Sequence, residues 1–174
     1  MNRYLFVIDY QNDFVDGALG FPGAEKLDEK IAAKIRSYGK GKVLFTRDTH
    51  FDNYMSTQEG RNLPVEHCIK DTEGWQICDE LIGYADVVVD KITFGSVELP
   101  QILKDYGEEI EEIEEIELCG LCTDICVISN AFVLKASFPE TKIVVDAKCC
   151  AGVSVESHET ALSAMRAVQI EIVD

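Results

Sequence analysis

Basic residues are scarce in this chain. It has 16 lysines and arginines against 32 aspartates and glutamates, a formal net charge of -16. Nucleic acids and anionic membranes need a basic surface to bind, so the composition argues against both as partners. No hydrophobic run approaches the ~20 residues of a membrane span, and no apolar leader stretch precedes the first predicted strand. Residues 107–115 carry much of the negative charge, and we interpret them as a solvated acidic turn.

The cysteines do not form a disulfide framework. There are seven, an odd number, in a chain long enough to need no covalent staples. We therefore expect free thiols and a cytoplasmic location. No paired C-x-x-C motifs indicate a structural zinc site. Cys119 and Cys122 fit a redox spacing formally, but they straddle a predicted strand end instead of opening a helix, which disfavours a redox role.

Length and composition are those of one globular domain. The chain has 174 residues, 47% of them hydrophobic and 28% charged, with no internal repeat or linker. We expect a single domain over residues 1–174. The sequence does not fix the oligomeric state, and a homo-oligomer is compatible with these bounds.

Apolar strand patterns alternate with amphipathic helix patterns along the chain. The predicted strands are 3–9, 42–46, 86–90, 113–119, 142–146 and 168–173, and the predicted helices are 23–38, 75–83, 97–106, 125–137 and 155–167. Residues 10–14 read as a polar loop and 51–73 as a long loop without periodicity. This alternation predicts an α/β fold with a parallel sheet covered on both faces.

Cys126 is the first candidate for catalysis. Thr123 or Asp124 would cap a helix that follows a strand directly, which places Cys126 in its first turn. Free backbone amides and the helix dipole favour a thiolate at such a position. The alternative is that Cys126 is a small buried hydrophobic residue, the usual role of a free cysteine.

Two further titratable residues share the same predicted edge of the sheet. Asp9 ends the first strand, Lys91 ends the third, and Cys126 follows the fourth. A lysine beside the sulfur stabilises a thiolate, and an aspartate can accept the thiol proton and return it to a leaving amine. Taken singly, Asp9 fits a turn former and Lys91 a surface residue paired with Asp90.

A second cluster indicates a metal. Asp48, His50 and His67 lie in and around the long loop and offer one carboxylate and two imidazoles. Zn²⁺, Mn²⁺ or Fe²⁺ accepts such ligands and keeps open positions. On spacing alone, solvated loop histidines are the alternative.

Five segments in order resemble the isochorismatase-like cysteine hydrolase superfamily, and within it the nicotinamidase-type amidases. They are residues 6–14 (FVIDYQNDF), 46–50 (TRDTH), 63–68 (LPVEHC), 91–96 (KITFGS) and 120–127 (GLCTDICV). The resemblance spans nearly the whole chain. It implies a three-layer sandwich around a mainly parallel six-stranded sheet.

The resemblance also implies roles for individual residues. Cys126 would be the nucleophile, Asp9 the general base and acid, and Lys91 the charge that steadies both. A cis peptide between Leu121 and Cys122 would aim the backbone amides of Cys122 and Cys126 at the oxyanion. A divalent metal, zinc first, would be bound by Asp48, His50 and His67 and would hold the pyridine nitrogen of nicotinamide. Glu59 is a candidate additional ligand, which the sequence leaves open.

The chain departs from the family pattern near the substrate. Leu63 stands where many nicotinamidases have tryptophan in the aromatic wall, and Glu66 is an extra residue before His67. Phe14 could stack on a planar substrate, although a place in the core fits it equally. We expect Phe14 and Leu63 to contact substrate.

The expected function is hydrolysis of a small amide through a thioester, with nicotinamide to nicotinate plus ammonia as the leading reaction. The alternatives are another small amide, ureido or carbamoyl compound, or isochorismatase-type hydrolysis, which Cys126 disfavours. A protein of a different class, one that binds a metal or ligand without turnover, is the remaining alternative.

Overall fold

The computed structural model describes residues 2–106 and 113–174. Most of the acidic turn expected at 107–115 therefore lies outside the described residues. Among those described, no helix is both long and apolar enough to cross a membrane.

One parallel sheet organises the molecule. Its six strands are β1 (Arg3–Ile8), β2 (Val43–Asp48), β3 (Val87–Lys91), β4 (Glu115–Leu121), β5 (Lys142–Ala151) and β6 (Glu171–Val173). They lie in the order β3-β2-β1-β4-β5-β6, and every pairing is parallel. The prediction of a mainly parallel six-stranded sheet is confirmed.

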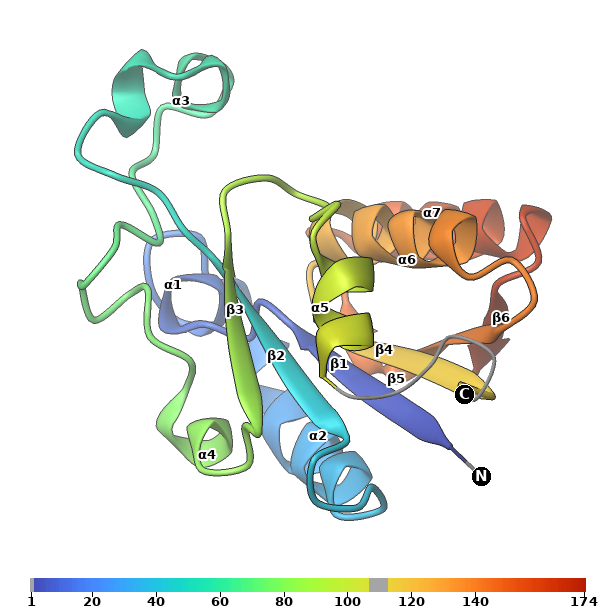
Figure 1. Ribbon diagram of the computed structural model, residues 1–174. Helices are drawn as coiled ribbons and strands as arrows, with labels where there is room; N and C mark the ends of the chain where they lie inside the picture. The colour runs from blue at the N-terminus through green and yellow to red at the C-terminus, as the bar shows by residue number, and fades with distance from the viewer. Residues whose placement is uncertain (1, 107–112) are drawn as a thin grey trace.

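Helices cover both faces of the sheet. The α-helices are α1 (Asn12–Val15), α2 (Asp28–Ile35), α3 (Gln58–Asn62), α4 (Asp79–Ile82), α5 (Leu99–Asp105), α6 (Ile128–Ser137) and α7 (Val155–Ala167). Short 3₁₀ turns span Ala24–Leu27 (η1) and Tyr54–Ser56 (η2), and a π-helical turn (η4) spans Thr123–Val127. Helices α5, α6 and α7 lie over one face and α2 and α4 over the other, whereas α3 sits at the tip of an arm that projects from the body (Figure 1).

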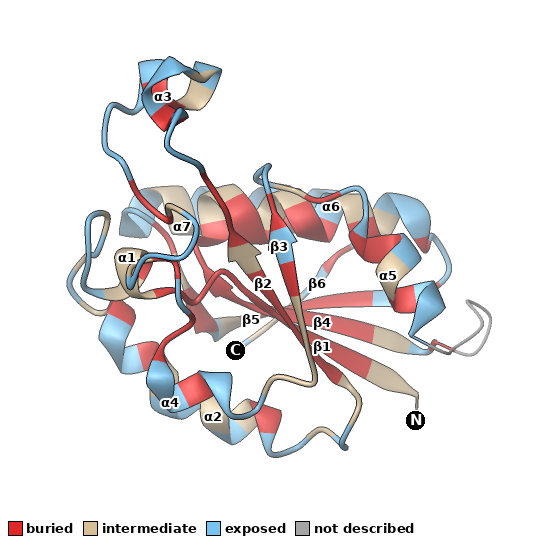
Figure 2. Cartoon of the chain, turned by 60° about the vertical axis from the view of Figure 1, so that its left-hand side comes forward, coloured by how far each residue is buried: buried red, intermediate tan, exposed pale blue. Residues whose placement is uncertain are grey.

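The burial pattern explains the apolar strand sequences. All residues of β1 after Arg3 are buried, because helices pack on both of its faces (Figure 2). β1 is followed outward by β2 and β3 on one side, and β4 returns to its other side. The strand order thus reverses between β1 and β4. In open α/β sheets, ligands bind at the carboxyl ends of the strands beside such a switch point.

Several local predictions were wrong. Residues 12–15 of the expected polar loop form α1, and the loop 51–73 contains η2 and α3. The helix predicted at 75–83 is confined to Asp79–Ile82. β5 runs on to Ala151, so Cys149 and Cys150 are strand residues. These segments are too short or too irregular to show a helical or strand periodicity in the sequence, so their structure depends on contacts with the rest of the fold.

Candidate active site

Lys91 contacts the other two residues of the expected triad, Asp9 and Cys126. Its Nζ lies 2.5 Å from Asp9 Oδ2 and 3.6 Å from Cys126 Sγ, and all three side chains are buried. The structure therefore brings the predicted residues together, although they are separated by 35 or more positions in the chain. They meet beside the β1–β4 switch point, where Lys91 reaches across from the end of β3, one strand beyond β2.

Thr46 orients the aspartate. The Thr46 hydroxyl donates to Asp9 Oδ1 at 2.6 Å and accepts from the Asp9 backbone N–H at 3.2 Å. Oδ2 is thereby left to face Lys91. Asp9 itself has a left-handed backbone, with φ of 44°, where the chain turns out of β1.

Burial acts on the acid–base groups of the triad. Burial raises the pKa of the Cys126 thiol well above its usual value, and the positive charge of Lys91 only partly opposes this. Burial also raises the pKa of Asp9 against the charge of Lys91. Burial therefore opposes the thiolate that the helix position favours, and Lys91 and Asp9 are the groups placed to assist removal of the thiol proton.

The turn that carries Cys126 is a π-helical turn instead of the start of a capped α-helix. Its N-cap residue is Cys122, without a side-chain cap, so neither Thr123 nor Asp124 is the predicted cap. The Thr123 hydroxyl instead bonds His158 Nδ1 at 2.8 Å, and Asp124 Oδ1 accepts from the Val153 N–H at 3.1 Å. These bonds fix the turn to α7 and its leading loop. Single π turns occur frequently at functional sites.

Backbone geometry before this turn matches the expectation. The Leu121–Cys122 peptide is cis. Gly120 has φ of 117°, and a Cβ there would lie 2.1 Å from the Ile8 carbonyl oxygen. Only glycine allows β1 and β4 to approach so closely at the switch point.

A candidate metal centre adjoins the triad. Asp48, His50, Glu59 and His67 offer ligand atoms that all lie within 4.8 Å of one another. His50 Nε2 is 3.0 Å from Asp48 Oδ2 and 3.5 Å from Glu59 Oε1, and His67 Nε2 lies 3.7 and 3.6 Å from the same two oxygens. The three predicted ligands converge, and Glu59 joins them from α3.

The surroundings of these residues fit a divalent cation. His50 Nε2 is buried and has no hydrogen-bond partner within geometric limits. His67 Nδ1 lies 2.8 Å from the Val65 carbonyl, which fixes it as the protonated nitrogen and leaves the Nε2 lone pair facing the cluster. Two imidazoles and two carboxylates suit zinc, manganese or iron(II).

Asp48 connects the metal cluster to the triad. While Oδ2 faces the histidines, Oδ1 accepts a hydrogen bond from Lys91 at 3.3 Å. Burial alone would raise the pKa of Asp48, but the charge of Lys91 and the neighbouring His50 and His67 rings hold that pKa well below its usual range. Asp48 therefore offers an anionic carboxylate to both sites.

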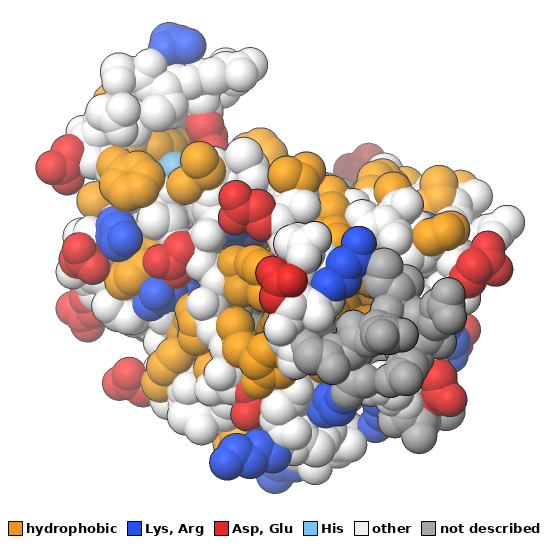
Figure 3. Space-filling model, in the orientation of Figure 1, with side chains coloured by type: hydrophobic (Ala, Val, Ile, Leu, Met, Phe, Trp, Pro, Cys, Tyr) orange, Lys and Arg blue, Asp and Glu red, His pale blue; other side chains and the backbone are white. Residues whose placement is uncertain are grey.

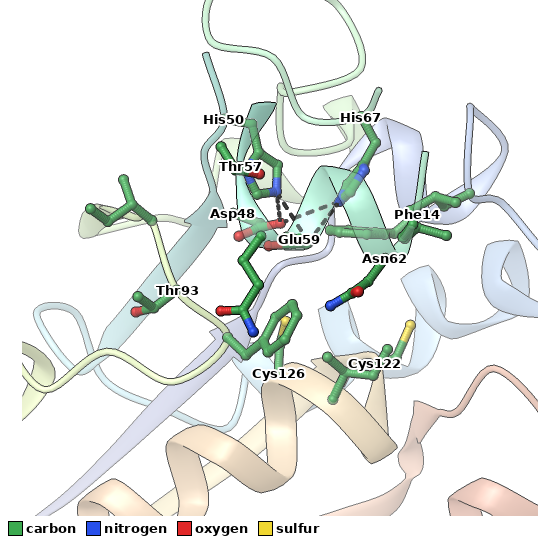
Figure 4. Close-up of a pocket in the computed structure, with 16 residues that line it drawn as sticks. Phe14, Asp48, His50, Thr57, Glu59, Asn62, His67, Thr93, Cys122 and Cys126 are labelled. Atoms are coloured by element: carbon green, nitrogen blue, oxygen red, sulfur yellow. Dashed lines mark ion pairs between the residues drawn. The ribbon is translucent and has the colours of Figure 1, made fainter. Parts of the chain in front are cut away.

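A cavity of about 620 Å³ contains the metal cluster and Cys126. Phe14 and Leu63, the expected substrate contacts, both line it, as do Cys122 and Ile125. Phe14 and Asn62 lie between the histidines and the two cysteines (Figure 4). From outside, a histidine is visible at the base of the arm among hydrophobic side chains (Figure 3). A small ligand in this one cavity could therefore contact both the candidate metal ligands and Cys126.

Sequence reasoning missed several residues that build this site. The Gln11 amide donates to the Asp48 carbonyl at 2.9 Å and accepts from the Asp48 N–H at 2.7 Å, which fixes the end of β2. The fully buried Tyr54 packs edge-on against both His50 and His67. Of these residues, Gln11 could have been found from the sequence, because it lies in the family segment 6–14 together with Asp9. Tyr54 lies in a segment without periodicity.

Fold and site together define a parallel α/β domain with a cysteine beside a candidate metal centre. The isochorismatase domain family matches residues 3–174, and the chain belongs to this family.

Individual relatives narrow the comparison. The isochorismatase family protein PncA of Bacillus subtilis (strain 168) is 31% identical over 94% of this chain and 93% of its own length. The nicotinamidase/pyrazinamidase of Mycobacterium tuberculosis is 26% identical over 98% of both chains. The crystal structure of the pyrazinamidase of Pyrococcus horikoshii in complex with zinc superposes with a TM-score of 0.84 at 28% identity, covering 100% of this chain and 99% of that one.

Proposed function

We propose that this protein is a cysteine amidohydrolase that converts nicotinamide to nicotinate and ammonia. The observation that carries the proposal is the placement of Cys126, Lys91 and Asp9 in contact, within one cavity that also holds the cluster of Asp48, His50, Glu59 and His67. The names of the Mycobacterium tuberculosis and Pyrococcus horikoshii relatives support the substrate class.

In the first half-reaction, Cys126 Sγ attacks the carboxamide carbon as its proton passes to Asp9. Lys91, 3.6 Å from the sulfur, stabilises the negative charge that develops there. The C–N bond then breaks, Asp9 returns the proton to the leaving nitrogen, and ammonia departs. A thioester remains on Cys126.

In the second half-reaction, Asp9 takes a proton from water, whose oxygen attacks the thioester carbon. The C–S bond breaks, the acid is released, and the proton returns the sulfur to its thiol form. Because Asp9 is buried and its pKa is raised, it can serve as base and acid in turn.

The backbone amides of Cys122 and Cys126 are the proposed oxyanion donors. Both belong to the N-terminal end of the η4–α6 helical segment, where the first amides have no carbonyl one turn earlier to bond. Each preorganised donor of this kind is worth about 3 kcal/mol of transition-state stabilisation.

The proposed metal ligands are Asp48, His50 and His67, with Glu59 as a fourth, and zinc is the first choice. When bound, the ion would supply a Lewis acid for the ring nitrogen of the substrate. The chain's contribution is to hold the ring between this cluster and Cys126, with Phe14 against its face.

Other small aromatic carboxamides, such as pyrazinamide, form the second candidate substrate class. Leu63 lines the cavity without an aromatic ring and is 38% exposed, so the wall at this point is open. A ring substituent has room there. Small amides without a ring nitrogen would lose the metal contact.

We further propose that residues 1–174 form one domain and that the protein works in a reducing cytoplasm. All seven cysteines are free and buried, which supports the second point. The small amide is the proposed binding partner.

Ammonia release across nicotinamide, pyrazinamide, benzamide and a ureido compound tests the proposal. Nicotinamide should give the highest kcat/KM, and benzamide, which lacks the ring nitrogen, should be at least about tenfold poorer. Thermal stabilisation by nicotinamide without ammonia release would identify a binding protein instead and contradict the proposed reaction.

A further inference from the structure

Asn130 lies behind the active site and does not line the cavity. It belongs to α6, four residues after Cys126, and its side chain is fully buried, with an exposed fraction of 0%. Neither the expected triad nor the metal cluster uses it. A buried amide needs hydrogen-bond partners, so its contacts show what it holds together.

The Asn130 side chain makes three hydrogen bonds that reach two different elements. Its Nδ2 donates to the Cys126 carbonyl at 2.8 Å and to the Phe94 carbonyl at 3.1 Å, while its Oδ1 accepts from the Ser96 N–H at 2.9 Å. The two carbonyls and the single N–H fix the orientation of the amide. Both N–H donors of the amide and one lone pair of its oxygen are used in these three bonds.

The partners on the second element form one wall of the cavity. We call residues 92–96 the wall loop. It follows Lys91, and its residues Ile92, Thr93 and Phe94 line the cavity. Lys91 Nζ donates to the Thr93 carbonyl at 3.1 Å, so the triad holds the loop from one side and Asn130 from the other.

Close packing at Gly95 shows how tightly the wall loop fits against α6. A Cβ built on Gly95 would lie 2.9 Å from the Ser129 carbonyl oxygen and 3.0 Å from Ser129 Cβ. The loop therefore has no room to approach the helix further. Asn130 prevents it from moving away.

We propose that Asn130 is a positioning residue that locks the wall loop to the nucleophile helix and so sets where the substrate ring lies relative to Cys126. This inference rests on the proposed amide hydrolysis. A displacement of about 1 Å in such a site costs roughly 10²-fold in rate, because the reacting atoms must stay near attack distance. Asn130 acts through the wall, since it touches neither the cavity nor the sulfur.

The most informative variant is Asn130→Ser. A serine hydroxyl at this position can still donate to the Cys126 carbonyl four residues earlier, but it is too short to reach Phe94 or Ser96. It therefore removes the loop-side bonds and keeps the helix-side bond. Gly95→Ala is a second variant, which pushes the same loop away from Ser129 of α6 and leaves Asn130 intact.

Three measurements separate positioning from a purely structural role. We expect kcat for nicotinamide to fall at least about tenfold in both variants, with KM changed less than about threefold, because a shift of the ring relative to Cys126 affects the attack more than ground-state binding. Alkylation of Cys126 by iodoacetamide should stay within about threefold of wild type, because Lys91 and Asp9 are unchanged. Hydrogen exchange in residues 92–98, which include the Ser96 amide, should accelerate at least about tenfold.

Thr141→Val is the matched control. Thr141 is also buried, and its hydroxyl donates to the Ile113 carbonyl at 3.3 Å, beside the amino end of β5 and away from the cavity. It should lower thermal stability without changing kcat or exchange in the wall loop.

Three results would overturn the proposal for Asn130. They are unchanged exchange in residues 92–98, an unchanged kcat per folded molecule, and a parallel fall of alkylation and turnover. If wild type releases no ammonia from nicotinamide, the proposed function fails by itself. The exchange and alkylation measurements then still decide whether Asn130 holds the loop.

Discussion

A buried lysine and a half-buried lysine in this protein each lie between two carboxylates but differ in the chemistry around them. Lys91 lies between the carboxylates of Asp9 and Asp48. Lys34 lies between those of Glu117 and Asp146, 2.7 Å from the latter. Even a cysteine is present in both places, since the Cys149 N–H donates to Asp146 Oδ1 at 3.2 Å.

Position in the sheet separates the two clusters. Lys91 ends β3, and its partners lie at the ends of β1 and β2, where the strand order reverses and a cavity opens. Lys34 reaches from α2 to residues inside β4 and β5, where the Tyr38 hydroxyl also donates to Glu117. A lysine between two acids therefore indicates a reactive site only at an open strand end. Elsewhere it is a structural ion pair.

Replacing the two cysteines tests this difference most strongly. Cys126→Ser should lower ammonia release from nicotinamide at least about 10³-fold, because an alcohol at this position is a far weaker nucleophile than a thiol. Cys149→Ser should keep kcat/KM within about twofold. Steady-state ammonia assays on both variants check this, and a Cys126→Ser enzyme near wild-type activity would rule out the thioester route.

Asp9→Asn should separate turnover from thiol reactivity. The carboxylate of Asp9 raises the pKa of the Cys126 thiol, on top of the larger effect of burial, so its neutralisation should lower that pKa and speed alkylation at pH 7. Turnover should fall about 10²- to 10⁴-fold, because the proton carrier is lost.

The measurement is the rate of iodoacetamide labelling against pH, together with ammonia release. Asp90→Asn, on the exposed surface beside Arg47, serves as the control and should change neither. Slower labelling in Asp9→Asn would contradict the assigned electrostatics.

Metal removal tests the role of the candidate metal cluster, in which Asp48 also accepts a hydrogen bond from Lys91. We expect a chelator to raise the KM for nicotinamide about 10- to 100-fold and to change iodoacetamide labelling of Cys126 by less than about threefold. His67→Ala should reproduce the effect more fully than Glu59→Gln, because His67 is buried and Glu59 comes from the projecting arm with its side chain 22% exposed.

Glu66→Gln is the matched control for these variants. Glu66 is exposed and lies beside His67 in the chain, outside the cluster. The Glu66→Gln variant should bind zinc as tightly as wild type, as measured by the rise in thermal stability during a zinc titration. Equal KM values with and without metal would show that the metal has no role in substrate binding.

Lys34→Met should change stability and leave catalysis intact. We expect a loss of about 1–3 kcal/mol in the free energy of unfolding near pH 7, less than for a fully buried pair because Lys34 is partly exposed. The value of kcat/KM should stay within about twofold.

The pH dependence of that loss has a definite sign. Burial opposes both charges, but hydrogen bonds between the partners outweigh it, so the pKa of Asp146 is lowered and the pKa of Lys34 is raised. The contribution of Asp146 is present above its unfolded pKa of 3.8 and is lost as the pH falls through the lower folded value. The contribution of Lys34 is present below 10.5 and is lost as the pH rises through the higher folded value.

Urea unfolding of wild type and Lys34→Met at several pH values measures this. The difference between them should be flat from about pH 5 to 9 and shrink toward both extremes. A difference that grows toward low pH would contradict the assignment.

The sequence was sufficient where position along a strand decides the outcome. Continuous apolar runs such as residues 4–8 predict buried parallel strands, and side chains that end such strands meet at one edge whatever the strand order. Asp9, Lys91 and Cys126 could therefore be placed together. The metal ligands Asp48 and His50 follow from the same logic, and the family motifs added His67.

Only the tertiary structure could decide what depends on packing between distant segments. The burial of Cys126, which raises the pKa of its thiol against the effect of the helix position, follows from this packing. Glu59 reaches the metal cluster because α3 folds from a segment without periodicity. Asn130 has neighbours in sequence that give no hint of Phe94 and Ser96, more than thirty residues away, and hydrogen bonds of that range exist only once the chain has folded.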